Sequence, residues 1–572
     1  MNFENIKIFF YNIFSFDERY PLLFTQFYFW AFFAIIFAGF SLLHNRKLLR
    51  NAFLFFASLF FYYKTSGLFV LILLFSTIYG YFIGKKIDRL EKQSLRKFHM
   101  ICGIIVNLLV LFYFKYAYFF TDTYNTLFHS NIAVVNHIAQ WANELSGSQR
   151  FDASKILLPV GISFYTFQNI SYLVDIYRKK INHVGNILDF GFYTTFFPQL
   201  VAGPIIRANQ FVPQLYKKFY LSRRQFGIAV FWILNGLTKK IILSDYLAVN
   251  FVDRVFNNPS LFTAFENLMA LFTYSLQVYA DFSGYTDIAI GVAMLMGFYL
   301  PINFNSPYKA TNAGAFWKRW HISLSTWLKD YLYIPLGGNR KGKFRTHVNL
   351  MTTMLLGGLW HGASWNFMIW GGLNGIGILI YKIWKKLTNQ YRTTLTFLLF
   401  ITFLILYYFF PNPAFVIGSV WSGIIFFGTF IDTLYTLIRK DHPLKWVNRA
   451  WSIFLTFVFI TFTRLFFRSG SNLDPVEANA TAWRTAKDMV SMIGGQWRVD
   501  LIPQIMYEYR FVFLLFIIGM IIHWLPDHFK RWYRINFAMF PIWLIGVIVV
   551  ITVFVLYQFI TADLQPFIYF QF

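Results

Sequence analysis

Long apolar segments alternate with short polar ones along most of this 572-residue chain. A helix of about 20 apolar residues is long enough to cross the hydrocarbon core of a bilayer. In the N-terminal third, apolar runs bounded by polar or turn-forming residues occupy 21 to 43, 52 to 63, 67 to 84, 100 to 120 and 157 to 177. The second run has only 12 residues, so we expect it to tilt or to re-enter.

Further apolar runs continue toward the C-terminal end. They occupy 226 to 245, 262 to 280, 284 to 300, 348 to 381, 393 to 411, 414 to 437, 451 to 468, 511 to 525 and 537 to 560. Together the runs predict roughly 11 to 13 crossings. We therefore predict an all-α polytopic integral membrane protein that forms a single membrane domain over residues 1 to 572. The runs show no two-fold symmetry of the kind that inverted-repeat transporters have.

The apolar stretch from about 186 to 205 differs from the others because basic clusters flank it on both sides. These clusters contain Arg178, Lys179, Lys180, Arg207, Lys217, Lys218, Arg223 and Arg224. Cations on both sides fit a segment that enters and leaves by the same face. Irregular backbone at membrane depth is stable only where protein or water satisfies its polar groups. We therefore predict a re-entrant segment that forms part of a cavity wall.

The charge of the chain supports a membrane location. Hydrophobic residues make up 57% and charged residues 13%, against about 25% charged residues in ordinary soluble domains. Lys and Arg number 51 and Asp and Glu 25, a net charge of +26, which in a soluble protein would suggest nucleic acid. When the first five runs are threaded alternately, one set of loops holds twelve cations and the other five. The positive-inside rule then places the N-terminus and the 121 to 155 loop outside the cytoplasm, so we expect a lipid bilayer and not nucleic acid as the partner.

Ionisable side chains inside apolar runs are candidates for function because they are costly at membrane depth. They are Lys115, Asp175, Asp281, Asp287, His361 and Arg464. His361 follows Gly357 and Gly358 by one helical turn, so a backbone or a substrate can approach it closely. The alternative is a histidine that joins two helices by a hydrogen bond.

A second histidine, His321, lies in a segment that is too charged to span and rich in aromatic residues. In a continuous helix Trp317, His321 and Ser325 would share one face, with Lys318 and Arg319 at its polar edge. The alternative is an amphipathic helix at the membrane surface, anchored by Trp and Arg. Imidazole titrates near pH 6.5 and is suited to remove a proton from a hydroxyl, so two histidines at one cavity would make a workable acyl-transfer site.

Other chemistries lack their sequence patterns. No nucleophile elbow, phosphate-binding loop or zinc-protease motif occurs. The single cysteine, Cys102, excludes an internal disulfide and a cysteine metal cluster, so we expect no metal and no bound cofactor. The glycines at 371 to 377 lie in a hydrophobic helix and predict close packing. Asp281 and Asp287 are six residues apart, do not share a helical face, and are interpreted as structural hydrogen-bonding groups.

Five segments of the chain resemble, in order, the membrane-bound O-acyltransferase family. They are LLPVGISFYTFQNISYLVDIYRKK, FFPQLVAGPIIR, YADFSGYTDIAIG, FWKRWHISLSTWLKDYLYIPLGGNRKG and GGLWHGASWNFMIWG. The resemblance places a catalytic core at about 67 to 381 and is greatest to the bacterial branch that O-acetylates exported polysaccharides. It implies that His361 is the catalytic histidine and His321 the second motif histidine. It also implies helices around a central tunnel, in which a cytoplasmic thioester meets an acceptor from the other side.

The same resemblance indicates further residues and partners. Candidates for the acyl donor or the tunnel are Trp317, Lys318, Arg319, Ser325, Trp360 and Asn366. The implied donor is acetyl-CoA or another acyl thioester, the acceptor a glycan, and the location the bacterial inner membrane. Residues 382 to 572 add transmembrane helices and a polar segment near 469 to 510, as in the polysaccharide branch, which usually works with a periplasmic SGNH-type esterase or transferase.

Two other functions stay open on the sequence. One is a D-alanyl or other acyl transferase of the same family that acts on teichoic acid, lipid or protein. The other, from a different class, is a flippase for an acylated glycan or lipid, in which the histidines relay protons.

Overall fold

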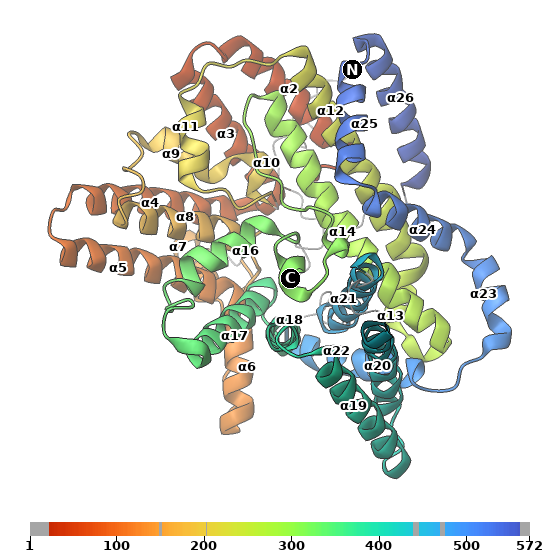
Figure 1. Cartoon of the computed structure of the whole chain (residues 1–572). Coiled ribbons are helices and arrows are strands. Elements are labelled where there is room, and N and C mark those ends of the chain that lie inside the picture. The colour runs from red at the N-terminus through yellow and green to blue at the C-terminus, as the bar shows by residue number, and fades with distance from the viewer. Residues whose placement is uncertain are drawn as a thin grey trace. The chain divides into compact units, whose positions relative to one another are not determined.

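The computed structural model describes residue 16 and residues 22–147, 151–201, 203–438, 445–468 and 475–560 (Figure 1). Within these residues the regular elements are all helices. The chain divides into two compact units. The first comprises Met1–Leu237, Tyr285–Ile302 and Arg534–Val550, and the second Thr238–Gly284, Asn303–Tyr533 and Ile551–Phe572. The prediction of an all-α fold is confirmed.

The first unit contains most of the N-terminal helices. They are α2 (Phe27–Leu43), α3 (Lys47–Ser66), α4 (Val70–Arg89), α5 (Gln93–Leu111), α6 (Ala117–Phe128), α7 (His137–Ser146), α8 (Ile162–Tyr177), α9 (Ile187–Thr195), α10 (Phe197–Leu200), α11 (Ala208–Leu215) and all but the last residue of α12 (Arg223–Thr238). Helix α8 packs against α4 and α5, and these three lie side by side in Figure 1. Of the 16 residues of α8, 15 are buried, so this helix is the centre of its unit.

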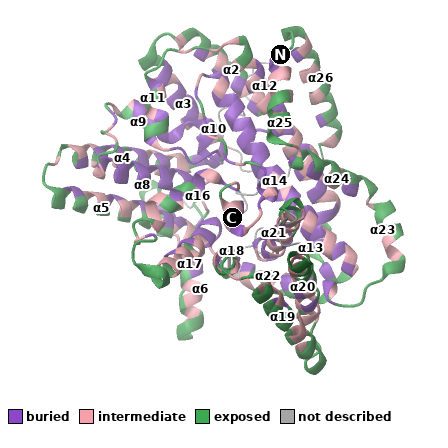
Figure 2. Cartoon of the chain, viewed as in Figure 1, coloured by how far each residue is buried: buried purple, intermediate pink, exposed green. Residues whose placement is uncertain are grey.

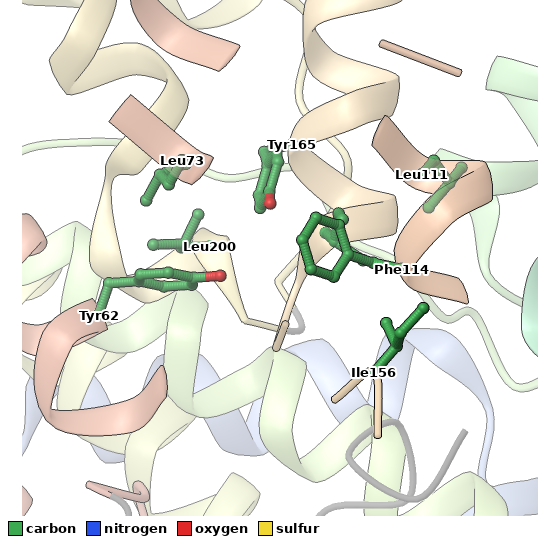
Figure 3. Close-up of a cluster of buried hydrophobic side chains, with 8 residues drawn as sticks. Tyr62, Leu73, Leu111, Phe114, Ile156, Tyr165 and Leu200 are labelled. Atoms are coloured by element: carbon green, nitrogen blue, oxygen red, sulfur yellow. The ribbon is translucent and has the colours of Figure 1, made fainter. Parts of the chain in front are cut away.

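One hydrophobic cluster of the first unit links these helices (Figure 3). Tyr62, Leu73, Leu111, Phe114, Ile156, Ile162, Tyr165 and Leu200 form it. The Tyr62 hydroxyl donates a 2.7 Å hydrogen bond to the Val160 carbonyl, so the ring is buried without leaving its polar atom unsatisfied. The predicted re-entrant stretch forms α9 and α10, of nine and four residues. Both are too short to cross a bilayer, in agreement with that prediction.

The second unit holds the remaining helices. They are α13 (Asp253–Asn257), α15 (Ala313–Trp317), α16 (Ile322–Leu328), α17 (Gly342–His361), α18 (Trp365–Trp384), α19 (Asn389–Phe409), α20 (Pro413–Ile438), α21 (Lys445–Arg468), α22 (Pro475–Ile493), α23 (Ile502–Glu508) and α24 (Arg510–Trp524). Helices α14 (Ala264–Leu295), α25 (Asp527–Met539) and α26 (Ile542–Phe559) contribute residues to both units. The predicted polar segment near 469–510 corresponds to α22 and α23 and the turn between them, and its residues 469–474 lie outside the described part.

Several long helices expose apolar side chains, as a lipid environment requires. Figure 2 shows α19 and α26 mainly in the colours of exposed and half-buried residues. Leu398 on α19, Phe427 on α20 and Val550 on α26 are 57%, 60% and 69% exposed. Apolar patches of this extent do not occur on ordinary soluble monomers. The chain is therefore a multi-pass membrane protein.

The described residues contain eight helices long and apolar enough to cross a membrane, or nine if the bent pair Val499–Glu508 and Arg510–Trp524 is one span. The sequence indicated more. One reason is that the runs 262 to 280 and 284 to 300 form a single 32-residue helix, α14. Their separation in the pattern was produced by the residues from Asp281 to Ser283, which continue the helix instead of ending it.

The run 348 to 381 shows the opposite error, because it contains two helices. Helix α17 ends at His361 and α18 begins at Trp365, with extended backbone at Gly362 and Ser364. Glycines bring the two helices together. A Cβ at Gly358 would collide with the Phe367 carbonyl oxygen. The prediction that Gly358 admits another backbone closely is thus confirmed, and the break places His361 at a helix end that faces α18.

Candidate active site

His361 is the last residue of α17 and is only 2% exposed. Aromatic rings surround its imidazole edge-on. The ring of Trp370, from α18, lies 5.0 Å away between centroids at 88°, and that of Phe467, from α21, lies 5.6 Å away at 72°. Trp360, the preceding residue, is 5.0 Å away at 83°. Three helices of the second unit therefore enclose this histidine in an apolar, aromatic environment.

His321 lies in the turn between α15 and α16 and is fully buried. The prediction of a continuous helix with Trp317, His321 and Ser325 on one face was wrong. Helix α15 ends at Trp317, and His321 precedes α16 with φ of 42° and ψ of 58°, the left-handed region that non-glycine residues rarely adopt. Such strain persists only where the surroundings hold it, and it is frequent at functional sites.

Asn303 holds His321 in this conformation. Its side-chain oxygen receives hydrogen bonds from the Ser323 backbone N–H at 3.0 Å and the Ser323 hydroxyl at 2.9 Å. Because a backbone N–H donates to it, this atom is the amide oxygen. It also lies 3.2 Å from Nδ1 of His321, so Nδ1 carries the proton and donates. In the neutral ring the other nitrogen, Nε2, then carries the lone pair.

The two histidines form a pair. Their ring centroids lie 6.3 Å apart at an angle of 68°, and both rings contact Trp360. Burial lowers the pKa of His321 to about 3, because the charged form loses its hydration. The ring is therefore neutral at physiological pH. Two histidines that are 40 positions apart in the sequence therefore lie close together in the fold.

The other predicted site residues lie at different distances from this pair. Trp317 donates through Nε1 to Asn374 at 3.2 Å and packs on Trp370, which in turn contacts His361. Trp360 contacts both histidines. Asn366 is buried in the first turn of α18, and its amide nitrogen has no hydrogen-bond partner among the described residues.

The polar candidates of the His321 segment lie on its outer side. Lys318 is exposed. Arg319 is half-buried and donates to the Asn305 carbonyl at 2.9 Å. The Ser325 hydroxyl donates to the Trp320 carbonyl at 3.3 Å. None of these side-chain hydrogen bonds reaches His321 or His361, so the roles of the three residues toward a donor or tunnel stay predictions.

The two α14 carboxylates have structural partners. Asp281 forms an ion pair with Lys240 at 2.6 Å, and Lys240 also binds Asp245 at 2.7 Å. Asp287 accepts a 2.7 Å hydrogen bond from the Asn235 amide. These contacts agree with the interpretation of both residues as structural groups.

Sequence reasoning missed Asn303 and the aromatic residues Trp370 and Phe467. Asn303 lies 18 positions from His321 in a segment without helical spacing, so no local pattern links them. Phe467 is one of 74 phenylalanines and carries no distinguishing signal.

Comparisons with known proteins identify the family of the chain. Residues 178–421, which contain both histidines, match the model of MBOAT, the membrane-bound O-acyltransferase family. Peptidoglycan O-acetyltransferase of Helicobacter pylori is 34% identical over 414 residues, covering 67% of this chain and 75% of that protein. The chain belongs to the membrane-bound O-acyltransferase family. It is an acyltransferase, and the predicted core boundaries at 67 and 381 stay predictions.

Other relatives are similar over different lengths. A probable alginate O-acetylase of Pseudomonas aeruginosa is 38% identical over 387 residues, covering 66% of this chain and 70% of that protein. Teichoic acid D-alanyltransferase of Bacillus subtilis is 28% identical over 246 residues, or 41% of this chain and 61% of that protein. The two O-acetylating relatives therefore match more of the chain, and at higher identity, than the D-alanylating one.

Proposed function

We propose that this acyltransferase moves an acetyl group from cytoplasmic acetyl-CoA to a hydroxyl of an exported polysaccharide or cell-wall glycan. The similarity to relatives named for O-acetylation of alginate and peptidoglycan supports the acetyl group and the glycan acceptor. The buried pair His321 and His361 carries the proposal, because hydroxyl acylation needs a positioned base.

In the proposed reaction His361 takes the proton of the acceptor hydroxyl as its oxygen attacks the thioester carbonyl carbon. A C–O bond forms and the carbonyl electrons move to oxygen, giving a tetrahedral oxyanion. When this collapses the C–S bond breaks, and the sulfur of coenzyme A leaves with the proton that His361 returns. His321 is a positioning residue. Because its ring is neutral, the histidine pair can take up one proton from the acceptor hydroxyl.

The aromatic enclosure serves this chemistry by keeping water away. Trp360, Trp370 and Phe467 contact His361 edge-on. A site without water protects the thioester from hydrolysis and strengthens electrostatic interactions with the developing charge. The position of His361 at a helix end, together with a location at membrane depth, would let substrates from the two sides of the membrane meet at one point.

The topology and partners form part of the same proposal. The basic loops face the cytoplasm, where the donor is found, and the glycan approaches from the other side through a tunnel. The protein resides in the bacterial inner membrane, and a periplasmic SGNH-type partner completes delivery to the glycan. The excess of cations in one set of loops supports this orientation.

The test is acetyl transfer by the full-length protein in proteoliposomes, to which the periplasmic SGNH-type protein encoded beside its gene is added. Labelled acetyl-CoA is supplied as the donor, with de-O-acetylated alginate or peptidoglycan as the acceptor. His361→Ala is expected to lower the rate by about 10²- to 10⁴-fold without loss of folding, as checked by thermal unfolding. His347→Ala, on the same helix but 14 residues away, is the matched control and is expected to keep the rate. Wild-type transfer by His361→Ala would overturn the role of His361.

A D-alanyl donor is the second candidate, favoured by the match to teichoic acid D-alanyltransferase. A parallel reaction with a D-alanyl-carrying phosphopantetheine protein separates the two. If the protein transfers an acyl group only from the D-alanyl donor, the proposed activity is D-alanylation and not acetylation.

A further inference from the structure

Arg464 is a buried cation within the second unit. It lies on α21 and is 2% exposed. Its guanidinium carbon is 4.3 Å from the centroid of the Trp320 ring and 5.9 Å from that of Tyr308. Stacking on an aromatic face satisfies the plane of a guanidinium but leaves the N–H groups on its edge available to an acceptor.

The carboxylates in this region are bound by other cations. Lys240 pairs with Asp245 at 2.7 Å and Asp281 at 2.6 Å, and Arg468 pairs with Asp253 at 2.7 Å. Arg464 makes no ion pair with a described residue, and its Nε has no hydrogen-bond partner among them. Arg468, one turn away on the same helix, thus has a counter-ion in the described part of the chain, and Arg464 has none there.

A buried charge without a counter-ion is unfavourable for folding. Tyrosine and tryptophan rings compensate only part of the lost hydration. A side chain of this kind inside a membrane protein is therefore best explained by an anion that is present during function.

The location of Arg464 indicates which anion this is. Trp320, on which the guanidinium stacks, immediately precedes His321 in the sequence. Phe467, three residues after Arg464 and on the same side of α21, contacts the His361 ring. Arg464 thus stacks on the residue that precedes His321 and lies one helical turn from a residue that contacts His361. In acetyl-CoA a long pantetheine arm separates the phosphates from the thioester. The anion expected near the histidines is therefore the oxygen of the reacting carbonyl and not a phosphate of the donor.

We propose that Arg464 is a catalytic residue that donates hydrogen bonds to the carbonyl oxygen of the thioester as negative charge develops there. The inference rests on the proposed acyl transfer. While the acceptor oxygen bonds to the carbonyl carbon, the carbonyl electron pair moves to oxygen and is stabilised by the guanidinium. The pair returns to re-form the carbonyl as the C–S bond breaks. The arginine keeps its proton throughout.

The test compares Arg464→Met and Arg464→Lys with wild type in the proteoliposome assay with acetyl-CoA. Methionine keeps apolar contact with Trp320 but cannot donate. We expect kcat to fall about 10²- to 10³-fold, as on removal of an oxyanion donor, while KM for acetyl-CoA is nearly unchanged. Lysine restores part of the rate because it keeps one charged donor.

Thermal unfolding separates this role from a structural one. Arg464→Met removes a charge without a counter-ion, so the Tm is expected to equal or exceed that of wild type. The matched variant Arg468→Met leaves Asp253 without its partner and is expected to lower the Tm. A large fall in Tm for Arg464→Met would assign Arg464 to the fold.

The kinetic outcomes are also distinct. A higher KM for acetyl-CoA with unchanged kcat would place Arg464 at a donor phosphate and overturn the inference. Unchanged kcat and KM would overturn it as well, while the proposed function would stand on the wild-type rate. If wild-type protein transferred no acyl group from any donor, the proposed function would fail, and this inference with it.

Discussion

The side-chain oxygen of Asn303 accepts a 3.2 Å hydrogen bond from Nδ1 of His321. The same oxygen accepts the backbone N–H of Ser323, so one asparagine fixes the proton position on the histidine and the start of α16. The contact joins a segment without regular structure to a strained turn and thereby positions one half of the histidine pair.

Removal of this oxygen is expected to impair catalysis. Asn303→Ala leaves the Ser323 N–H and Nδ1 of His321 without a partner, at a cost of about 1–3 kcal/mol in stability for each buried group. The ring is then free to change tautomer, so kcat falls more than KM rises. Asn303→Asp keeps the acceptor and raises the pKa of His321 through its charge. Its rate profile against pH should shift to higher pH, whereas a purely structural asparagine would leave the profile in place.

Acid is expected to destabilise the protein partly through His321. Its pKa is about 3 in the folded protein and about 6.5 in an unfolded chain. Between these values the unfolded chain binds the proton and the folded one does not. Above about pH 6.5 the burial of this ring therefore costs no protonation free energy. Below that pH the proton bound by the unfolded chain lowers the free energy of unfolding, by roughly 2 kcal/mol at pH 5.

Thermal unfolding of wild type and His321→Asn between pH 7 and pH 5 measures this effect. Asparagine can still donate an N–H toward Asn303 but does not titrate. The Tm of wild type should fall more over this range than that of the variant. Equal falls would show that His321 does not contribute to the acid sensitivity.

Gly358 is expected to be indispensable for the packing of α17 on α18. An added Cβ meets the Phe367 carbonyl oxygen, which belongs to the backbone and cannot rotate away. Gly358→Ala should therefore lower the Tm and, because His361 follows by one turn, the activity. Gly546, inside α26, has nothing within 4 Å of an added Cβ. Gly546→Ala is the matched control and should leave stability unchanged or raise it by up to about 1 kcal/mol.

Lys240 is expected to be structural. Its ammonium group pairs with Asp245 and Asp281, and the exposed fractions of the three side chains are 3%, 15% and 5%. Lys240→Met leaves two buried carboxylates facing one another and should cost about 3–5 kcal/mol. Combining it with Asp245→Asn and Asp281→Asn removes the charges together and should recover most of the loss. Absence of recovery in the triple variant would contradict the ion-pair explanation. Unfolding in detergent measures both variants.

The apolar pattern was enough to predict the class of fold, because about 20 apolar residues in a row have few stable environments other than a bilayer. It did not predict where helices end. Asp281 and Ser283 read as a break between two runs but continue α14, since a helix at this position satisfies their backbone internally and Lys240 neutralises the acid. Gly362 to Ser364 read as part of a run but separate α17 from α18.

The amino-acid sequence was enough to predict a helical membrane protein. It also singled out His361 and Arg464, because ionisable residues are rare among apolar neighbours, and His321, because it lies in a charged segment rich in aromatic residues. The contacts of these residues follow from the tertiary structure alone. The left-handed turn at His321 depends on Asn303, the enclosure of His361 on Trp370 and Phe467, and the lack of a counter-ion at Arg464 on carboxylates bound elsewhere. Each is a contact between residues distant in the sequence, and such contacts leave no periodic trace in the chain.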